Sequence, residues 1–600
     1  MTYRCVFPAL LLGLFVCTCA PSPSENRGVE VGKQDVPPNI LFILTDDQGV
    51  GDLSLHGNDS IRTPNMDALL TSGAQFSRFY VSPVCAPTRA SFLSGLYSPR
   101  TGAVFVTRRR ETMDDGIMTI PEYLKHAGYR TGLFGKWHNG STKPYDPNGQ
   151  GFDQFLGFTL GHFNDYFNGE LENEDNEVVP FNGDLTTILT DTAAHFMLAD
   201  QDQPFFCMLT YQAPHTPVQV ADKYWNPVKS RGLTDYNTGV YAMIESVDDH
   251  IGKLLDQLEA AGKLDNTIVI FSTDNGPNGD RYRMGLKGTK GSVNEGGVRV
   301  PFGIRFPNGH PANGRQFHTP AAHIDLVPTL LDIVGLPQPP GGLDGKSLMP
   351  LLEPDSSRVF DQNRPIYAFK QGYDFTGYPG SVRNSHRLVV MNSPDDFEAY
   401  EIHKDEGQRT NIMASDADFL KGVQGHAREM AAEYNRFAAT IARPDLIAPP
   451  INLDAAQFRP VHLQAHEGEP LGETHFMDEY GWSNDFFVDL DWNGAYWPVE
   501  ITQDRTYRVT IHYHAEKNIR LGIQMDSLQQ DLKFIELPKA ITPQLSVADR
   551  VKRKEVYPRQ WATAIVEDFT VRAGASELHI FGGYDNDTET GLWIKEVTLQ

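Results

Sequence analysis

The stretch Asn39–Gly49, NILFILTDDQG, contains five consecutive apolar residues that end abruptly at Thr45, Asp46 and Asp47. A short, continuous apolar run bounded by polar residues predicts a strand that is buried on both faces. Such strands are typical of parallel or mixed sheets that helices cover on both sides. The stretch therefore indicates an α/β fold.

The same pattern recurs in three further segments, YRTGLFGKWH (129–138), PFFCMLTYQAPH (204–215) and NTIVIFSTDNG (266–276). Between them lie helical patterns, the clearest being apolar residues spaced three and four apart over 241–258, closed by Gly262. The alternation predicts an α/β fold with a large mixed sheet flanked by helices. Ligands of such sheets bind beyond the carboxyl ends of the strands, so the polar residues after the four runs are expected to share one site.

The pattern changes along the chain in a way that predicts further parts. We assign 37–340 to the α/β catalytic domain and 341–442, with short strands followed by a long helix, to a smaller α+β subdomain. A proline-rich stretch predicts a linker over 443–464. Alternating apolar residues, as in TYRVTIHYH (506–514), predict a β-rich, sandwich-like accessory module over 465–600.

The N-terminus and the composition indicate an exported protein. Residues 1–19 have a basic residue, Arg4, before an apolar run too short to span a bilayer, which is typical of an export signal. Cys19 is a candidate for a lipid anchor, so the expected location is the periplasm, the cell surface or the medium. A net charge of -25, spread along the chain, argues against nucleic-acid binding.

Five cysteines do not form a disulfide framework once the leader is removed. Cys207 lies in an apolar run and is expected to be an ordinary core residue. Cys85, between two prolines in PVCAPTR (83–89), has no such explanation.

Asp46 and Asp47 follow one predicted strand, and Asp274 and Asn275 follow another. Each pair alone is more often a turn or a helix cap than a ligand set. Two pairs after two buried strands favour one divalent cation, and hard oxygen ligands suit Ca²⁺ or Mg²⁺ better than zinc.

Several cationic side chains could surround a small anion at the same edge, each donating charged hydrogen bonds. They are Arg89, Lys136, His138, His215 and Lys290. Lys287 shares the glycine-rich loop of Lys290, and that loop could equally be a surface turn. Weaker candidates for substrate binding, with a solvated or structural role equally open, are Arg108, Arg109, His162 and Asp165.

CAPTR (85–89) fits the C-x-P-x-R signature of the type I, formylglycine-dependent sulfatases of the alkaline phosphatase superfamily. The chain resembles this family over roughly 38–441, because five further motifs agree in order and spacing. They are NILFILTDDQG, GYRTGLFGKWH, APHTP, STDNG and KGSVNEGGVRVP. Phe134, Asn139 and Ser94 depart from the family pattern without removing a group that the chemistry needs.

The resemblance implies that a maturation enzyme oxidises Cys85 to formylglycine during export. It implies that Asp46, Asp47, Asp274, Asn275 and the modified Cys85 bind one cation, calcium in preference to magnesium. One hydroxyl of the hydrated aldehyde would attack sulfur while Arg89 and Lys136 hold the formylglycine. His215 with Lys290 would protonate the leaving oxygen, and His138 would take the proton of the second hydroxyl as sulfate is expelled.

The expected function is therefore that of an exported, arylsulfatase-like sulfuric ester hydrolase acting on a sulfated carbohydrate, a polysaccharide or its oligosaccharides. Two alternatives stay open: a phosphodiester or phosphonate monoester hydrolase of the same superfamily, and a non-catalytic glycan-binding protein in which Cys85 remains a thiol. The aromatic residues of the accessory module are expected to form its core more readily than a glycan platform. They are Trp482, Trp492, Tyr496 and Trp497.

Overall fold

The computed structural model describes residues 37–600 except 176, 200–202, 354–357, 371, 442–447, 458, 479–480, 527–529 and 584–589. The predicted export signal (1–19) and the candidate lipid anchor at Cys19 lie outside the described residues, as does the start of the predicted linker. Pro38–Gln600 packs as one compact unit. Within the described residues, no helix is both long enough and apolar enough to cross a membrane.

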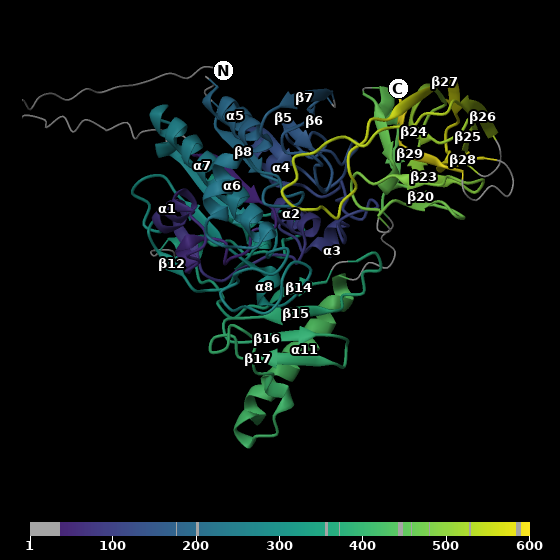
Figure 1. Ribbon diagram of the computed structural model, residues 1–600. Helices are drawn as coiled ribbons and strands as arrows, with labels where there is room; N and C mark the ends of the chain where they lie inside the picture. The colour runs from purple at the N-terminus through teal and green to yellow at the C-terminus, as the bar shows by residue number, and fades with distance from the viewer. Residues whose placement is uncertain are drawn as a thin grey trace, which may run out of the picture. The chain divides into compact units, whose positions relative to one another are not determined.

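A mixed sheet organises the catalytic domain, and ten strands of the described chain belong to it (Figure 1). Its central strands run parallel, while β11 and β6 pair antiparallel with their neighbours. The order across the sheet is β12 (Gln316–Phe317), β2 (Ala74–Phe76), β11 (Phe302–Arg305), β9 (Thr267–Thr273), β1 (Asn39–Thr45), β8 (Phe205–Thr210), β4 (Arg130–Lys136), β5 (Gln154–Phe158), β6 (Asn168–Asn173) and β7 (Val178–Asn182). The α/β prediction is confirmed.

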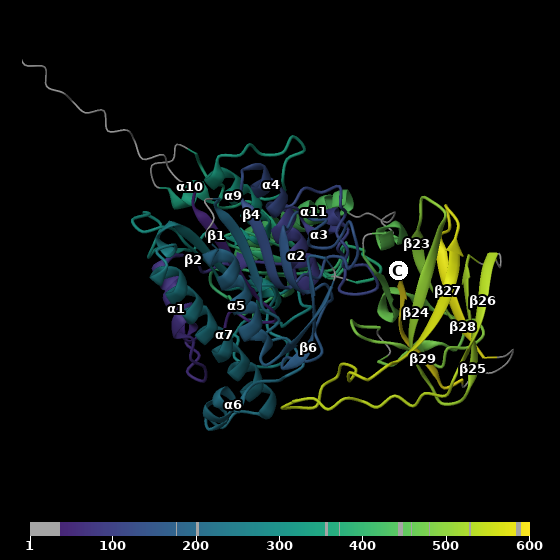
Figure 2. The same ribbon diagram turned by 90° about the horizontal axis from the view of Figure 1, so that it is seen from above.

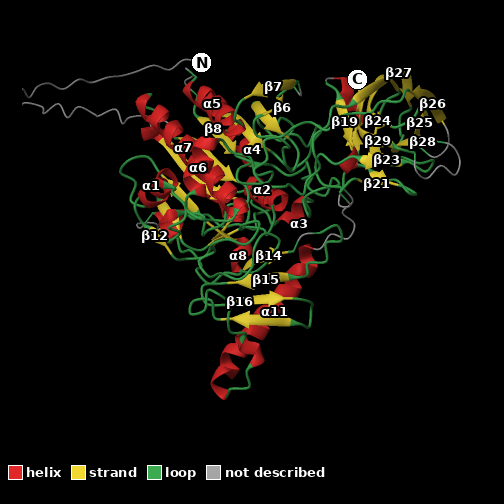
Figure 3. Ribbon diagram, viewed as in Figure 1, coloured by secondary structure: helices red, strands yellow, loops and turns green. Residues whose placement is uncertain are grey.

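Strand β1 shows why its sequence is apolar throughout. Ile40, Phe42 and Leu44 enter a core that includes residues of α2 (Cys85–Ser94), α4 (Ile120–His126) and α9 (Leu326–Val334). Leu41 and Ile43 point the other way, into a core with α1 (Pro64–Ser72), α5 (Leu185–Leu198) and α7 (Asp235–Ala260). Helices therefore cover both faces of the sheet, as Figure 3 shows by the red elements around the yellow strands.

The smaller subdomain is an antiparallel sheet with one long helix packed on it (Figure 3). The strands, in order, are β14 (Ile366–Phe369), β15 (Gly380–Arg383), β16 (Leu388–Met391) and β17 (Phe397–Tyr400). Helix α11 (Lys421–Ile441) buries Ala427, Met430, Ala431 and Tyr434, spaced three and four apart, against this sheet.

The C-terminal module consists of two β-sheets that share a core. One contains β18 (Ile451–Asn452), β23 (Ala495–Glu500), β28 (Glu577–Gly582), β25 (Ile519–Met525) and β26 (Gln530–Leu537). The other contains β21 (His475–Phe476), β22 (Phe487–Val488), β29 (Leu592–Leu599), β24 (Arg505–Ala515) and β27 (Ala562–Val571), with β19 (Val461–Gln464) also paired to β29. Of the four aromatic residues considered above, Trp497 is fully buried in this core.

The predicted linker of 443–464 needs correction from Ile451 onward. Strand β18 pairs with β23, β19 pairs with β29, and Val461 and Leu463 are buried in the sandwich core. The strands are only two and four residues long and stand among prolines and polar residues, so their alternation is too short to read from the sequence.

A long connection, residues 538–561, joins β26 to β27; we call it the strap. It leaves the sandwich and runs along the catalytic domain to the neighbourhood of α6 (Asp222–Lys229), as the yellow loop in Figure 2 shows. The strap brings residues of the module next to the catalytic domain.

Candidate active site

The site lies where four adjacent parallel strands end. Across the sheet these strands are β9, β1, β8 and β4, and each is followed by polar residues of the predicted set. Helix α2 begins at Cys85 by the same edge, and the Cys85 sulfur lies within 4.8 Å of carboxylate oxygens of Asp46 and Asp274. Residues distant in sequence therefore meet because parallel strands present their carboxyl ends together.

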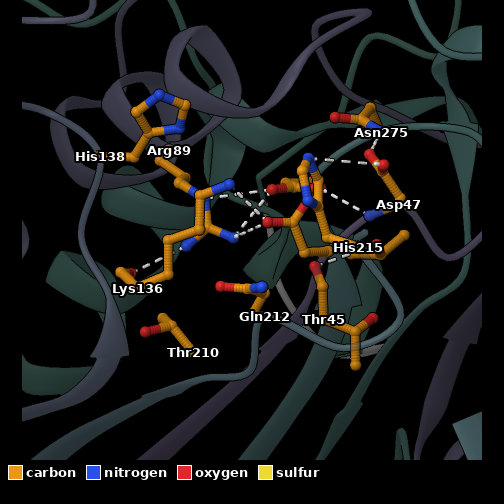
Figure 4. A network of polar contacts seen from close by, with 12 residues as sticks. Thr45, Asp47, Arg89, Lys136, His138, Thr210, Gln212, His215 and Asn275 are labelled. Carbon is orange, nitrogen blue, oxygen red and sulfur yellow. Dashed lines mark hydrogen bonds and ion pairs between the residues drawn. The ribbon is translucent and has the colours of Figure 1, made fainter. Parts of the chain in front are cut away.

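Each of the three aspartates is paired with a cation on one of its oxygens. Figure 4 shows Arg89 and Lys136 in this network, with Asp47, His215 and Asn275. Lys136 Nζ lies 2.5 Å from Asp46 Oδ2, and Arg89 donates to Asp274 Oδ2 from Nε at 3.1 Å and from Nη2 at 2.8 Å. On the other side of the site, Lys290 Nζ lies 2.7 Å from Asp47 Oδ1. Arg89 also donates to the carbonyl oxygen of Lys136 at 2.9 Å.

Other oxygens of the acidic group accept no hydrogen bond from the described residues. Among the described residues, Asp46 Oδ1, Asp47 Oδ2 and Asn275 Oδ1 are buried without a hydrogen bond. Burying such oxygens is costly unless something binds them. Carboxylate and amide oxygens are ligands of hard divalent cations, so these residues fit the cation that the family resemblance implies.

The pKa values of the carboxyl groups point the same way. Burial alone would raise the pKa of Asp46, but Lys136, His215 and Arg89 lower it below its usual value. Burial and the neighbouring Asp46 raise the pKa of Asp274 to about 7, against Arg89 and Lys136. Two buried carboxylates this close ionise together only with additional positive charge, which a cation supplies.

The two histidines are neutral at neutral pH. Burial and then Lys136 lower the pKa of His138, and burial and then Lys290 lower that of His215. Each ring places one nitrogen against a carbonyl oxygen, His138 Nε2 at 2.9 Å from Val106 and His215 Nδ1 at 2.8 Å from Thr216. A carbonyl only accepts, so these nitrogens carry the protons and the other nitrogen of each ring keeps a lone pair.

Cys85 is the first residue of α2 and is 3% exposed. Burial raises the pKa of its thiol, which is therefore protonated at neutral pH. Since the thiolate is the nucleophilic form, the unmodified side chain is a weak nucleophile here.

A cavity of about 310 Å³ opens onto these residues. Cys85, His138, His215 and Lys290 line it, and so does His162, whose ring stacks with that of His215 at 6.0 Å between centroids. The module adds Trp482, Ser483 and Glu555 to the wall. Sequence reasoning missed Ser483 and Glu555 and favoured the core of the module for Trp482, because no local pattern marks side chains that join the site from a separate module.

Two of the remaining candidates lie elsewhere. Asp165 accepts a hydrogen bond from the Phe167 amide and does not line this cavity. Lys287 pairs with Glu398 and Tyr400, so Lys290 is the lysine that the glycine-rich loop brings to the site.

Arg108 and Arg109, predicted to bind substrate, are turned toward the module instead. Arg109 is 7% exposed and donates to the carbonyl oxygens of Glu467 and Pro449 at 3.0 Å each. Arg108 lies over the Phe476 ring, 4.9 Å from its centroid. Arg108 and Arg109 both have positive φ angles, 55° and 60°. A run of basic residues in the sequence does not predict this backbone conformation. The structure assigns them to the contact between domain and module.

Comparison with known proteins identifies the family. Residues 38–336 match the sulfatase family, and 289–431 match the family described as N-sulphoglucosamine sulphohydrolase, C-terminal. Human arylsulfatase A is 32% identical over 440 residues, covering 63% of this chain and 83% of that protein. N-acetylglucosamine-6-O-sulfatase of Bacteroides thetaiotaomicron is 26% identical over 519 residues, covering 68% and 87%.

A solved structure agrees. The crystal structure of Ps i-CgsB in complex with k-i-k-neocarrahexaose has a TM-score of 0.61 and 28% identity, covering 69% of this chain and 95% of that one. These similarities agree with the carboxylates at the strand ends and with the cysteine at the start of α2. The chain therefore belongs to the sulfatase family of the alkaline phosphatase superfamily and is a sulfuric ester hydrolase.

Proposed function

We propose that the protein is an exported, calcium-dependent sulfatase that removes sulfate from a sulfated carbohydrate through a formylglycine made from Cys85. The observation that carries the proposal is the shared cavity: Cys85, beside Asp46 and Asp274, opens into the same space as Lys290 and His215. Support for a sugar substrate comes from the relative named for N-acetylglucosamine-6-O-sulfate and from the complex of Ps i-CgsB with a neocarrahexaose.

A calcium ion held by Asp46, Asp47, Asp274 and Asn275 would supply positive charge to the oxygens of the sulfuryl group. Calcium suits this set better than magnesium, which usually keeps several waters. The four side chains belong to residues that are at most 1% exposed, which leaves little room for such waters.

A hydrated formylglycine at position 85 would supply two hydroxyls, one to attack sulfur and one to release sulfate afterwards. Arg89, fixed by Asp274 and the Lys136 carbonyl, orients this position with Lys136. His138 keeps a lone pair on Nδ1, a buried atom without a partner among the described residues, and so can accept the proton of the second hydroxyl.

The leaving oxygen needs a proton donor. Burial disfavours the Lys290 ammonium, but Asp47 raises its pKa above the usual value, so the ammonium persists at neutral pH. His215 donates its Nδ1 proton to the Thr216 carbonyl, so Nε2 donates only in the protonated ring. At neutral pH Lys290 is therefore the member of the pair that carries an available proton.

The proposal is tested by expressing the full chain in a host with formylglycine-generating activity. Mass spectrometry of the Cys85 peptide, with aldehyde trapping, should show formylglycine, and sulfate should be released from members of a panel of sulfated glycans. Cys85→Ala should abolish release. A thiol that is entirely unmodified in the native host would support the glycan-binding alternative, and a large preference for aryl phosphate diesters over aryl sulfates would support the phosphorus-ester alternative.

Calcium is tested by thermal unfolding after chelation. Adding Ca²⁺ at about 100 times its Kd should raise the free energy of unfolding by about 2.7 kcal/mol. Mg²⁺ at the same concentration should raise the melting temperature less. Equal stabilisation by both ions would contradict the choice of calcium.

A further inference from the structure

We propose that the C-terminal module completes the active site, and that Glu555 and Trp482 form a subsite for a hydroxyl-bearing sugar ring whose only charged group is the sulfate to be removed. The inference rests on the proposed sugar substrate. Its starting point is that Trp482, Ser483 and Glu555 line the cavity into which Cys85 and Lys290 open.

The strap holds Glu555 in place through contacts with the catalytic domain. Arg550 donates to the Val220 carbonyl from Nε at 3.0 Å and from Nη2 at 2.8 Å, and Gln219 donates to Asp549 at 2.9 Å. Arg553 donates to the Asn164 carbonyl at 3.0 Å. The strap is therefore fastened to the loop that carries His215 and to a second loop at Asn164, and Glu555 reaches the cavity from a fixed position.

Glu555 is an anion at the wall of the cavity. Its carboxylate accepts a hydrogen bond from the Thr216 hydroxyl and another from the Lys554 amide at 3.2 Å. Burial would raise its pKa, but His162 and the Thr216 hydrogen bond lower it below the usual value. The lone pairs that remain can accept hydrogen bonds from a ligand.

The end of the cavity at Cys85 and Lys290 and the wall at Glu555 therefore differ in charge. Lys290, Lys136 and Arg89 balance the charges of Asp47, Asp46 and Asp274, so the divalent cation of the proposed function would make that end positive. Glu555 makes part of the wall negative. A sulfate belongs at the positive end. Sugar hydroxyls can donate to Glu555, whereas a uronate or a second sulfate at that position would be repelled.

A second segment of the module, residues 481–486, holds Trp482 at the same cavity. Ser483 Oγ accepts from the Gly161 amide at 2.9 Å, and Thr107 donates to the Gly481 carbonyl at 2.7 Å. Trp482 lines the cavity with Phe105 and Val106, which gives an apolar wall on which the face of a sugar ring can pack.

Gly161 permits this approach. A Cβ at position 161 would lie 2.6 Å from His138 Nε2 and 2.7 Å from Ser483 Oγ, closer than heavy atoms pack. The catalytic domain is thus shaped locally to receive the module. The matched family ranges end at residue 431, so this wall is a feature of the present chain outside those ranges.

The test compares Glu555→Gln and Trp482→Ala with the wild type. The probes are 4-nitrophenyl sulfate, monosulfated galactose and N-acetylglucosamine, and their disulfated counterparts. Glu555→Gln should lower kcat/KM for the monosulfated sugars relative to 4-nitrophenyl sulfate by about tenfold, mainly through KM, because hydrogen bonds to a charged acceptor are lost. Glu555→Gln should also reduce the ratio of kcat/KM for monosulfated sugars to kcat/KM for disulfated sugars, because the negative charge that repels a second sulfate is removed.

The matched control is Glu536→Gln, a glutamate of the same module whose side chain is 73% exposed, which should change neither ratio. Melting temperatures establish folding. If Glu555→Gln does not fold, Trp482→Ala keeps the Thr216–Glu555 contact and should still raise KM for the sugars more than for the aryl sulfate.

The possible failures are distinguishable. A wild type that releases sulfate from none of the probes or from the glycan panel overturns the proposed function and this inference with it. A wild type that is active on the sugars, but whose sugar-to-aryl ratio is unmoved in both folded variants, overturns this inference alone.

Discussion

Lys287 and Lys290 are three positions apart, but only Lys290 lines the cavity of the site. Lys290 lies 2.7 Å from Asp47 and lines the cavity, while Lys287 reaches Glu398 at 3.1 Å and Tyr400 at 3.0 Å. Both stand in one glycine-rich loop with the same local composition. The difference arises from the path of the backbone and not from the side chains.

Lys290→Ala should therefore lower kcat for an aryl sulfate by about 10²–10³-fold, the usual effect of removing one donor that stabilises developing charge. Lys287→Ala should leave kcat within about twofold, since it removes a partly exposed ion pair. Steady-state kinetics of both variants make the comparison. Equal losses would contradict the assignment of Lys290.

The sequence predicts the residues of the site that follow buried strands and misses those that do not. Asp46 and Asp274 are recognisable because each ends an apolar run, and neighbouring parallel strands bring them together. Glu555 joins the cavity from the strap, 340 positions after His215, and no periodicity connects the two. Arg109 is misleading because its backbone conformation, with φ of 60°, directs the side chain into the module.

At the scale of elements, β19 shows how a short strand is attached. His462 and Glu596 lie on the paired strands β19 and β29, with Nδ1 and Oε1 3.5 Å apart. Burial would raise the pKa of Glu596, but His462 lowers it to about 2. Glu596 in turn raises the pKa of His462 against the effect of burial.

The sign of each shift gives a pH window. The contribution of Glu596 is present above the ordinary glutamate pKa of 4.5 and is lost as the pH falls toward 2. The contribution of protonated His462 is present below the ordinary histidine pKa of 6.5 and is lost as the pH rises through its raised pKa. The pair should stabilise the module most between these limits.

Glu596→Gln should therefore lower the melting temperature more at about pH 5.5 than at about pH 9, by roughly 2–4 °C for each kcal/mol lost. Glu567→Gln is the control, because its exposed partner Arg508 stays charged at both pH values. A pH-independent effect of Glu596→Gln would show that the His462 charge does not matter.

The long elements are predictable from the sequence and the short ones are not. Strand β1 is a continuous apolar run bounded by polar residues, and helix α7 carries apolar residues spaced three and four apart, so both are recognisable. Strands β18 and β19 have too few residues to show a period, and they form because β23 and β29 offer free edges. Tertiary pairing, which the local sequence does not record, decides such cases.

In the molecule as a whole, Arg109 connects the catalytic domain to the module. It donates to carbonyl oxygens of Glu467 and Pro449 and is 7% exposed. Removing the guanidinium leaves these acceptors without their donor, which costs roughly 1–3 kcal/mol for a buried group.

Arg109→Ala should lower the denaturant midpoint and also reduce the activity on sulfated sugars relative to 4-nitrophenyl sulfate, because the module that it secures carries Trp482 and Glu555. Arg572→Ala, which removes an ion pair whose side chains are both more than half exposed, should do neither. Urea unfolding with activity measured on the same samples tests both effects. A lower stability with an unchanged ratio of sugar to 4-nitrophenyl sulfate activity would show that the module does not contribute to the active site.

The burial of Cys85 also limits the time during which an enzyme can reach its thiol while the protein is synthesised. The side chain is buried beside Asp46 and Asp274, and Asp274 is made 189 residues after it. At about 5–20 residues per second, this leaves roughly 10–40 s during which the thiol is on a chain that cannot yet close over it. An enzyme that modifies Cys85 can reach the thiol during that interval, so slower elongation should give a larger modified fraction. The same enzyme added to the folded, unmodified chain should give none.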